Sequence, residues 1–148
     1  MRRLRKYFAL SPSGRAIVLR SLMLLPMVTA LLRVRGMAHT TVFLGRLGGR
    51  AEHDHGTLAP REVARLVNAA ASVLRAHCLS RSLVLSHLLR NRGILTEIRL
   101  GVSKLSEEGL SAHAWVELNG LPINDGVDVS ERYAALPSSA AKFRAPRP

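Results

Sequence analysis

The hydrophobic pattern of this chain changes period once, near Gly93, and that change restricts the possible folds more than any other feature. Residues 60–75 (PREVARLVNAAASVLR) place apolar side chains, Leu74 included, at the spacing of an amphipathic helix, and Pro60 suits its first turn. Residues 94–102 (ILTEIRLGV) instead alternate apolar and polar positions, as half-buried strands do. Because helices come first and strands follow, the sequence predicts an α+β fold with antiparallel strands.

The single cysteine, Cys78, stands where a second helix is expected to begin. The apolar run LVLSHLL follows it, and Gly93 suits the position just after the end of that helix. A thiol attacks as the thiolate, and the unpaired N–H groups and dipole of a helix N-terminus favour negative charge. The same N–H groups can form part of an oxyanion hole. This position indicates a nucleophile, although a lone cysteine is more often an inert apolar residue.

A cysteine nucleophile needs a general base and a group that orients the base, and a predicted hairpin offers both. Residues 112–118 (AHAWVEL) and 121–125 (LPIND) flank the Asn-Gly pair at 119–120, a strong hairpin signal. A two-residue loop would put His113 and Asp125 on opposite faces of the sheet, where no hydrogen bond could join them.

A three-residue loop that also includes Leu118 places His113 directly opposite Asp125, within hydrogen-bonding reach. A slip of one residue inverts every side chain, so the chemistry favours this second register, and we predict it. Asp128 is the only rival to Asp125 as the orienting group. Trp115 shares the face of His113, either as a core residue or as a wall beside the thiol.

Most of the positive charge lies in the first third of the chain. The protein has 148 residues and a net charge of +12, and residues 1–51 contain ten basic residues and no acidic one. Such a field attracts nucleic acid, anionic lipid or an acidic protein partner, and peripheral membrane contact through residues 1–35 is one expectation. An arginine-rich codon bias would give the same composition.

An apolar run at 16–32 could be mistaken for a membrane span. Arg20 and Pro26 interrupt it, and its longest apolar part has 12 residues, where a span needs about 20. We therefore expect a buried or interfacial helix over about 15–35, capped by the turn SPSG at 11–14 and kinked or split at Pro26. The N-terminus lacks a clear signal-peptide cleavage site, which predicts a cytoplasmic protein.

The length fits one domain, with three expected regions. These are a basic helical N-terminal region (1–52), a core (53–136) and a flexible tail (137–148). One cysteine excludes an internal disulfide framework and a multi-cysteine zinc site. His53-Asp54-His55 resembles a metal motif, but it lacks further ligands nearby and fits a solvated turn, so no metal and no cofactor are predicted.

Three segments together resemble a known family, the transglutaminase-like cysteine peptidases. They are CLSRSLVLSHLLRNRGI (78–94), AHAWVELNG (112–120) and IND (123–125). They are most similar to the leader peptidases of lasso-peptide biosynthesis, the stand-alone B-type maturation proteins. The resemblance is strong over 60–135 and looser in the basic N-terminal part. It implies a transglutaminase-like core, with the nucleophile at a helix N-terminus packed on a small antiparallel sheet.

The resemblance also implies roles and partners. Cys78 would be the nucleophile, His113 the general base and then acid, and Asp125 the residue that orients His113. The implied reaction is hydrolysis of one peptide bond in a ribosomally made precursor. It would release the leader before a separate ATP-dependent cyclase closes the ring. A small leader-recognition protein would act in trans, docking on the N-terminal part.

Other polar residues near the cysteine are expected to have structural rather than catalytic roles. His77 adjoins Cys78, but sequence neighbours at a helix start point in different directions, so it is a weak candidate for the base. His87 lies within the apolar helix and is expected to be structural. Arg81 and Ser82, in the first turn, are expected to be structural too, although Arg81 could stabilise a thiolate.

Three other functions are considered beside peptide hydrolysis. Acyl or amide transfer can use the same triad, because an amine can replace water as the acceptor. A catalytically inactive scaffold is disfavoured by the presence of all three polar residues. A nucleic-acid-binding protein is disfavoured too, because the chain has only six aromatic residues and no recognisable nucleic-acid motif.

Overall fold

The fold is that of a computed structural model, which describes four stretches of the chain. They are residues 10–47, 58–103, 111–136 and 141–142. The boundary expected at 52/53, the motif at 53–55 and most of the loop expected at 103–111 lie outside the described residues. So does most of the tail expected at 137–148.

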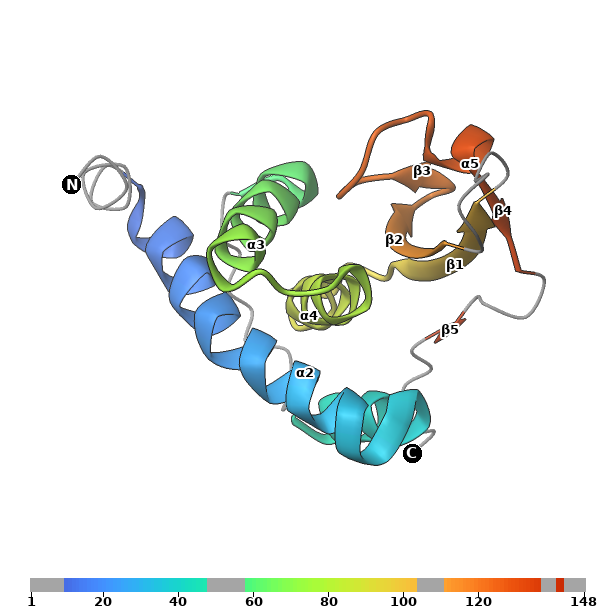
Figure 1. Cartoon of the computed structure of the whole chain (residues 1–148). Helices are drawn as coiled ribbons and strands as arrows, with labels where there is room; N and C mark the ends of the chain where they lie inside the picture. Colours follow the sequence, from blue (N-terminus) through green and yellow to red (C-terminus); the bar gives the residue numbers. More distant parts are fainter. Residues whose placement is uncertain (1–9, 48–57, 104–110, 137–140, 143–148) are drawn as a thin grey trace.

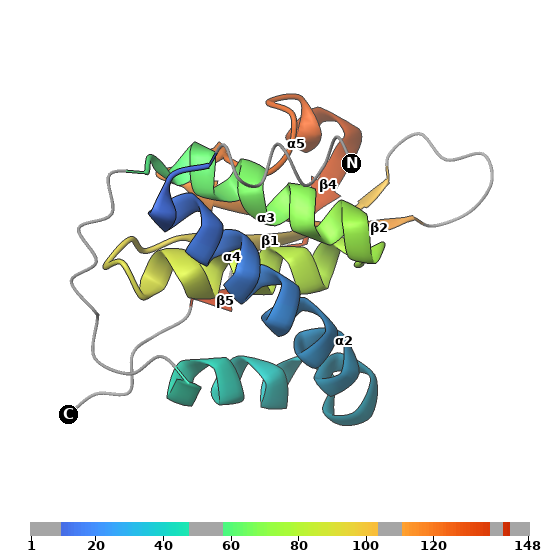
Figure 2. The ribbon, with the colours of Figure 1, turned by 90° about the vertical axis from the view of Figure 1, so that its left-hand side faces the viewer.

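Three layers make up the described structure. Helix α2 (Pro12–Leu47) lies against α3 (Pro60–Leu74) and α4 (Cys78–Arg90), and a small sheet lies on the other side of these two helices (Figures 1 and 2). Most of the buried apolar residues form one cluster that α2, α3 and α4 share with Ile98 and Val116 of the sheet. The predicted α+β fold, with a helical N-terminal part before an antiparallel sheet, is confirmed.

Helix α2 begins where the SPSG turn predicts a cap. The Gly14 N–H donates to Ser11 Oγ at 3.2 Å, and the Arg15 N–H donates to Ser11 O at 3.0 Å. The expected split at Pro26 is wrong, because the helical backbone continues through that residue. The break lies instead at Gly36 (φ 73°, ψ −178°), a conformation essentially confined to glycine. After this break a shorter helical stretch ends at Leu47.

Helix α3 matches its predicted span, with Pro60 in its first turn. Its buried face carries mostly the residues expected from the periodicity: Val63, Ala64, Leu66, Val67, Ala70 and Ala71. Leu74 was predicted on that face but is 42% exposed. The reason is that the helix ends there, with Arg75 in the left-handed region (φ 51°) turning the chain toward α4.

Helix α4 begins at Cys78, as predicted, and most of its residues are buried. Gly93 (φ 77°) ends the turn that follows it. The Ile94 N–H donates to Leu89 O at 3.0 Å and the Gly93 N–H donates to Arg90 O at 2.9 Å, which is the Schellman arrangement.

The sheet is antiparallel, with the strand order β3-β2-β1-β4 and a short β5 that also pairs with β1. Its elements are β1 (Glu97–Ser103), β2 (Ala112–Leu118), β3 (Leu121–Pro122), the helical turn α5 (Val129–Arg132), β4 (Tyr133–Ala135) and β5 (Ala141–Lys142). Strand β5 is the part of the expected tail that the structure describes. In the central pair, Gly101 of β1 lies opposite His113 of β2.

The predicted register of the β2–β3 hairpin is wrong. Leu118 pairs with Leu121, so the loop has two residues, and Asn119 (φ 52°) and Gly120 (φ 79°) both have the positive φ of a type I′ turn. The prediction failed because it assumed that the second strand continues to Asp125. The ladder ends at Pro122, and the chain bends out of it over the next residues.

A side chain takes over the hydrogen bonding where the ladder ends. The Ile123 N–H still donates to Val116 O at 3.0 Å, but the Val116 N–H donates to Asn124 Oδ1 at 2.8 Å instead of to a backbone carbonyl. Asp125 therefore leaves the position that a regular two-residue hairpin would give it, and it is able to reach His113.

Candidate active site

His113 and Asp125 form a direct contact at the edge of β2. The distance from His113 Nε2 to Asp125 Oδ2 is 2.6 Å, and the two side chains are 18% and 17% exposed. A carboxylate accepts, so Nε2 carries the proton of this hydrogen bond. In the neutral ring Nδ1 is then the basic nitrogen. The predicted hydrogen bond is present, although it arises from a bend and not from the predicted register.

Several groups keep Asp125 ionised. Burial raises the pKa of this carboxyl group, but the His113 hydrogen bond, the Gly126 N–H and the positive charges of His113 and Arg81 outweigh it and lower the pKa below its ordinary value. The Gly126 N–H donates to Oδ1 at 2.8 Å, and Arg132 donates to the same oxygen at 3.2 Å. Asp125 is therefore a carboxylate near neutral pH, suited to hold an imidazole and to stabilise its protonated form.

Cys78 is the first residue of α4 and is a free, half-buried thiol. His77 precedes it with extended backbone angles (φ −68°, ψ 157°), and the first intrahelical bond runs from the Arg81 N–H to His77 O at 3.1 Å. The earlier N–H groups of a helix have no intrahelical acceptor, and the positive end of the helix dipole lies beside them. An anion that forms at this sulfur, or at a carbonyl bound to it, meets a favourable field.

A buried polar cluster joins α4 to β2 one turn beyond the thiol. Ser82 Oγ donates to Ala114 O at 3.1 Å, and Asn124 Nδ2 donates to Ser82 Oγ at 3.4 Å. Ser82 follows Cys78 by four residues, so the two lie on the same side of the helix, and Ala114 is the chain neighbour of His113. Asn124 belongs to the same cluster and precedes Asp125. The elements that carry the three predicted residues are thus held together directly.

Aromatic rings cover the imidazole of His113. The ring of Tyr133 stacks on it, with centroids 4.8 Å apart and planes at 27°. The ring centroid of Trp115, which shares a face of β2 with His113, lies 6.3 Å from that of the imidazole. Trp115 is fully buried and donates to Glu117 Oε1 at 2.9 Å. Gly101 lies opposite His113 in the sheet. A Cβ at this position would lie 3.0 Å from the Trp115 ring, so the glycine leaves room for the indole. Trp115 is therefore a core residue that also supports the site.

Sequence reasoning missed two of these supporting residues. Tyr133 lies 20 positions after His113 and only the packing of β4 beside β1 brings it there. Asn124 was read as a strand residue, whereas its side chain replaces a backbone acceptor. The only available signal was the Asn-Asp pair itself, because asparagine and aspartate favour turns over strands.

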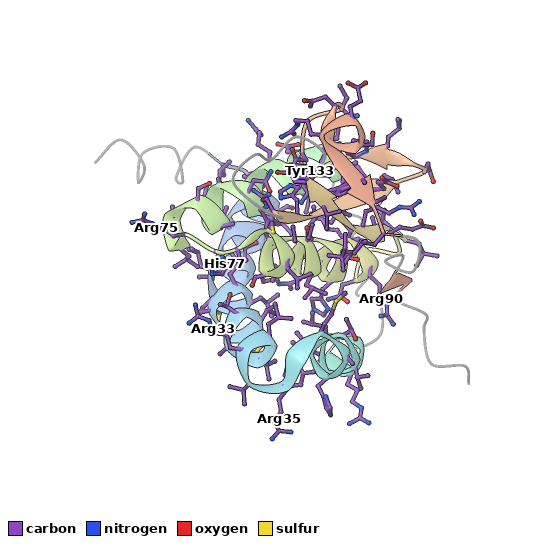
Figure 3. The ribbon with its side chains drawn as sticks, turned by 45° about the vertical axis from the view of Figure 1, so that its right-hand side comes forward. Arg33, Arg35, Arg75, His77, Arg90 and Tyr133 are labelled. Carbon is purple, nitrogen blue, oxygen red and sulfur yellow. The ribbon has the colours of Figure 1, made fainter. Side chains whose placement is uncertain are left out.

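The remaining candidates lie apart from this contact. His77 is exposed at the start of α4 (Figure 3). His87 is 4% exposed and is hydrogen-bonded to Asn91 Nδ2 at 3.2 Å and to the backbone of Leu44. Asp128, the rival of Asp125, pairs with Arg132 Nε at 2.9 Å. Within the described stretches, no three His, Cys, Asp or Glu side chains are grouped closely enough to hold a metal ion.

Comparison with known proteins gives one match. Residues 21–138 match the family model described as the transglutaminase-like superfamily, so most of the chain is covered, including most of α2. No curated protein and no solved structure gives a significant match. Members of this superfamily generally carry a Cys-His-Asp site and act as peptidases or transferases.

Proposed function

Because the chain belongs to the transglutaminase-like superfamily, we propose that it is a cysteine peptidase with Cys78 as nucleophile, His113 as general base and acid, and Asp125 as the orienting carboxylate. One observation carries the proposal: the 2.6 Å contact between His113 and Asp125, on a strand bound to the helix that begins at Cys78. A histidine that is bonded to a carboxylate through Nε2 has the arrangement that a thiol nucleophile requires.

The reaction proceeds in two halves on these side chains. His113 Nδ1 takes the thiol proton, and the Cys78 sulfur attacks the carbonyl carbon of the scissile peptide bond. N–H groups at the start of α4 stabilise the oxyanion, and the imidazolium, held by Asp125, gives its proton to the leaving amine. Water then attacks the thioester with His113 again as base, which releases the acid and restores the thiol.

The substrate in this proposal is the precursor of a lasso peptide, cut between leader and core. The three segments at 78–94, 112–120 and 123–125 support this choice by their resemblance to lasso leader peptidases. A cytoplasmic location and a small leader-recognition protein that presents the precursor belong to the same proposal. The ten basic residues of 1–51 suit an acidic leader or partner.

Intact-mass analysis tests this function. The full-length protein is mixed with the precursor encoded beside its gene, with and without the small recognition protein. We expect two fragments whose masses sum to that of the precursor plus one water. Cys78→Ala should abolish the cleavage, whereas His39→Ala, at an exposed histidine of α2, should not change it.

The possible outcomes separate the parts of the proposal. Cleavage that survives Cys78→Ala removes the mechanism. Cleavage of another peptide that depends on Cys78, with the lasso precursor left intact, keeps the mechanism and removes the substrate. A product in which the acyl group is joined to an amine, without the added water, assigns the protein to the transferases.

A further inference from the structure

The first part of α2, residues 12–35, has apolar side chains on both of its faces. Its inner face contributes Ile17, Leu25 and Val28 to the core. On the outside, Leu19 is 55% exposed, Met23 69% and Val34 77%. A surface helix normally turns polar residues to the solvent, so the outer face of this helix calls for an explanation of its own.

Five of the exposed apolar residues in the first part of α2 form one continuous stripe. At 3.6 residues per turn, five exposed residues fall within an arc of about 80°. We call them the outer stripe: Leu19, Met23, Pro26, Ala30 and Val34. Helix α3 exposes Arg61, Arg65 and Ser72 along its outer side, and its large exposed apolar residues, Val73 and Leu74, lie only at its end. The outer stripe is thus a property of α2 and not of the helical layer as a whole.

Positive charge borders the outer stripe, with no negative charge near it in sequence. On the helical wheel Arg33 lies at one border and Arg20 at the other. Figure 3 shows Arg33 and Arg35 extending away from the body of the protein. Residues 1–51 contain no acidic residue. An apolar strip between arginines is the composition of helices that lie in the interface of an anionic bilayer.

We propose that the outer stripe is a docking surface for an anionic lipid bilayer, with residues 12–35 of α2 lying flat on it. By length and composition alone α2 could cross a membrane, but its inner face is part of the protein core, which favours lying on the surface. A flat bilayer suits a convex helix, and arginine stems can extend to the phosphates while the stripe enters the acyl boundary. The sheet lies on the far side of α3 and α4 from α2 (Figure 1), so a bound protein would keep His113 open to a peptide.

Vesicle sedimentation tests the proposal with the full-length protein. One set of vesicles contains phosphatidylcholine alone, and the other contains equal parts of phosphatidylcholine and phosphatidylglycerol. We expect binding to the anionic set that weakens as salt is raised. Met23→Gln combined with Val34→Gln should weaken that binding by about tenfold or more, and Arg33→Gln should weaken it by a smaller factor. Leu95→Gln, at an apolar residue that is 74% exposed elsewhere, and Arg61→Gln are the matched controls and should bind like the wild type.

Three results would overturn the proposal. The first is a wild type that does not bind anionic vesicles. The second is that the stripe variants bind as well as the wild type and melt at the same temperature. The third is a dimer in gel filtration that Met23→Gln abolishes, which would assign the stripe to a second copy of the chain. Each result is independent of peptide cleavage, so failure here leaves the proposed activity standing.

Discussion

The two oxygens of the Asp125 carboxylate bind different groups. Oδ2 holds the imidazole of His113, and Oδ1 is held in turn by the Gly126 N–H and Arg132. Replacing this oxygen pair by an amide keeps the shape but can present the wrong group to Nε2.

We therefore expect a graded series of activities. Cys78→Ala should abolish peptide cleavage, and His113→Ala should be nearly as inactive, because thiol and base act as one unit. Asp125→Asn should lower kcat by about 10²–10⁴-fold and still leave measurable cleavage. Initial rates from product masses check the order, and an Asp125→Asn enzyme as active as the wild type would show that the carboxylate is not needed.

Asn124 is expected to matter for geometry, although it takes no part in the chemistry. Its side chain is 5% exposed and joins the Val116 N–H to Ser82 of α4. Asn124→Ala leaves buried polar groups without partners, which should lower the free energy of unfolding by about 1–3 kcal/mol. At a temperature where the variant is folded, kcat should still fall while KM changes little. An unchanged kcat would mean that this side chain supports the fold alone.

The sequence predicts three chemical residues because each carries a reactive group beside a recognisable local pattern, and the contact between His113 and Asp125 is the part of this prediction that the structure confirms. Cys78 precedes an apolar helix, and His113 and Asp125 flank an Asn-Gly turn. Tyr133 and Asn124 could not be inferred, because their roles depend on contacts across strands and on a bend that side-chain hydrogen bonds create.

At the scale of elements, Gly36 determines the course of α2. It lets the chain turn back so that Leu44 enters the same core as Leu25 and Val28. The sequence pointed to Pro26 instead, because proline is the stronger helix breaker in general. A proline within a helix removes one backbone hydrogen bond and the helix can continue, whereas the backbone angles of Gly36 lie outside the helical region and end the first helical stretch.

Gly36→Ala should therefore destabilise the protein. Nothing lies within 4 Å of an added Cβ, so the effect comes from the backbone angles alone and amounts to about 1–3 kcal/mol. Gly45→Ala is the matched control, because Gly45 lies in the helical stretch with only Arg90 near an added Cβ, at 3.9 Å. It should stabilise the protein by about 0.5–1 kcal/mol. Chemical denaturation measures both, and equal effects of the two substitutions would contradict this account of the break.

Local sequence patterns were sufficient to predict α3, α4, β1 and β2. The spacing of apolar residues indicated the helices and β1, and the Asn-Gly pair indicated β2. These patterns were insufficient for the hairpin register. The two-residue turn follows from Asn-Gly, but the early end of β3 at Pro122 depends on competition between a backbone ladder and the Asn124 side chain. This competition does not change the spacing of apolar residues, so the sequence pattern does not reveal it.

For the whole molecule, His87 makes stability depend on pH. Burial lowers its pKa below the ordinary 6.5, against an opposing hydrogen bond to the Leu44 backbone, and the charge of Arg90 lowers it further. The folded protein therefore keeps His87 neutral where the unfolded chain is protonated. Below pH 6.5 the unfolded state binds the additional proton, so stability falls as the pH falls.

Thermal unfolding between about pH 7.5 and about pH 5.5 measures this effect. We expect the melting temperature to decrease toward the acidic end, and His87→Gln to reduce that slope. His39→Gln, at an exposed histidine, should keep it. The carboxyl of Asp125 does not interfere, because its pKa is lowered from 3.8 and its contribution is lost only at more acidic pH. A slope that is the same in His87→Gln and in the wild type would contradict the assignment.

The most direct test concerns the proposed coupling of Cys78 to His113, which lie on α4 and β2, two elements joined by the hydrogen bond from Ser82 to Ala114. Because Cys78 is the only thiol, the gain in intact mass after treatment with iodoacetamide reports this residue alone. At neutral pH we predict that His113→Ala slows the alkylation of the folded protein by about tenfold or more, while His39→Ala leaves its rate unchanged. Equal rates in the wild type and in His113→Ala would contradict the account.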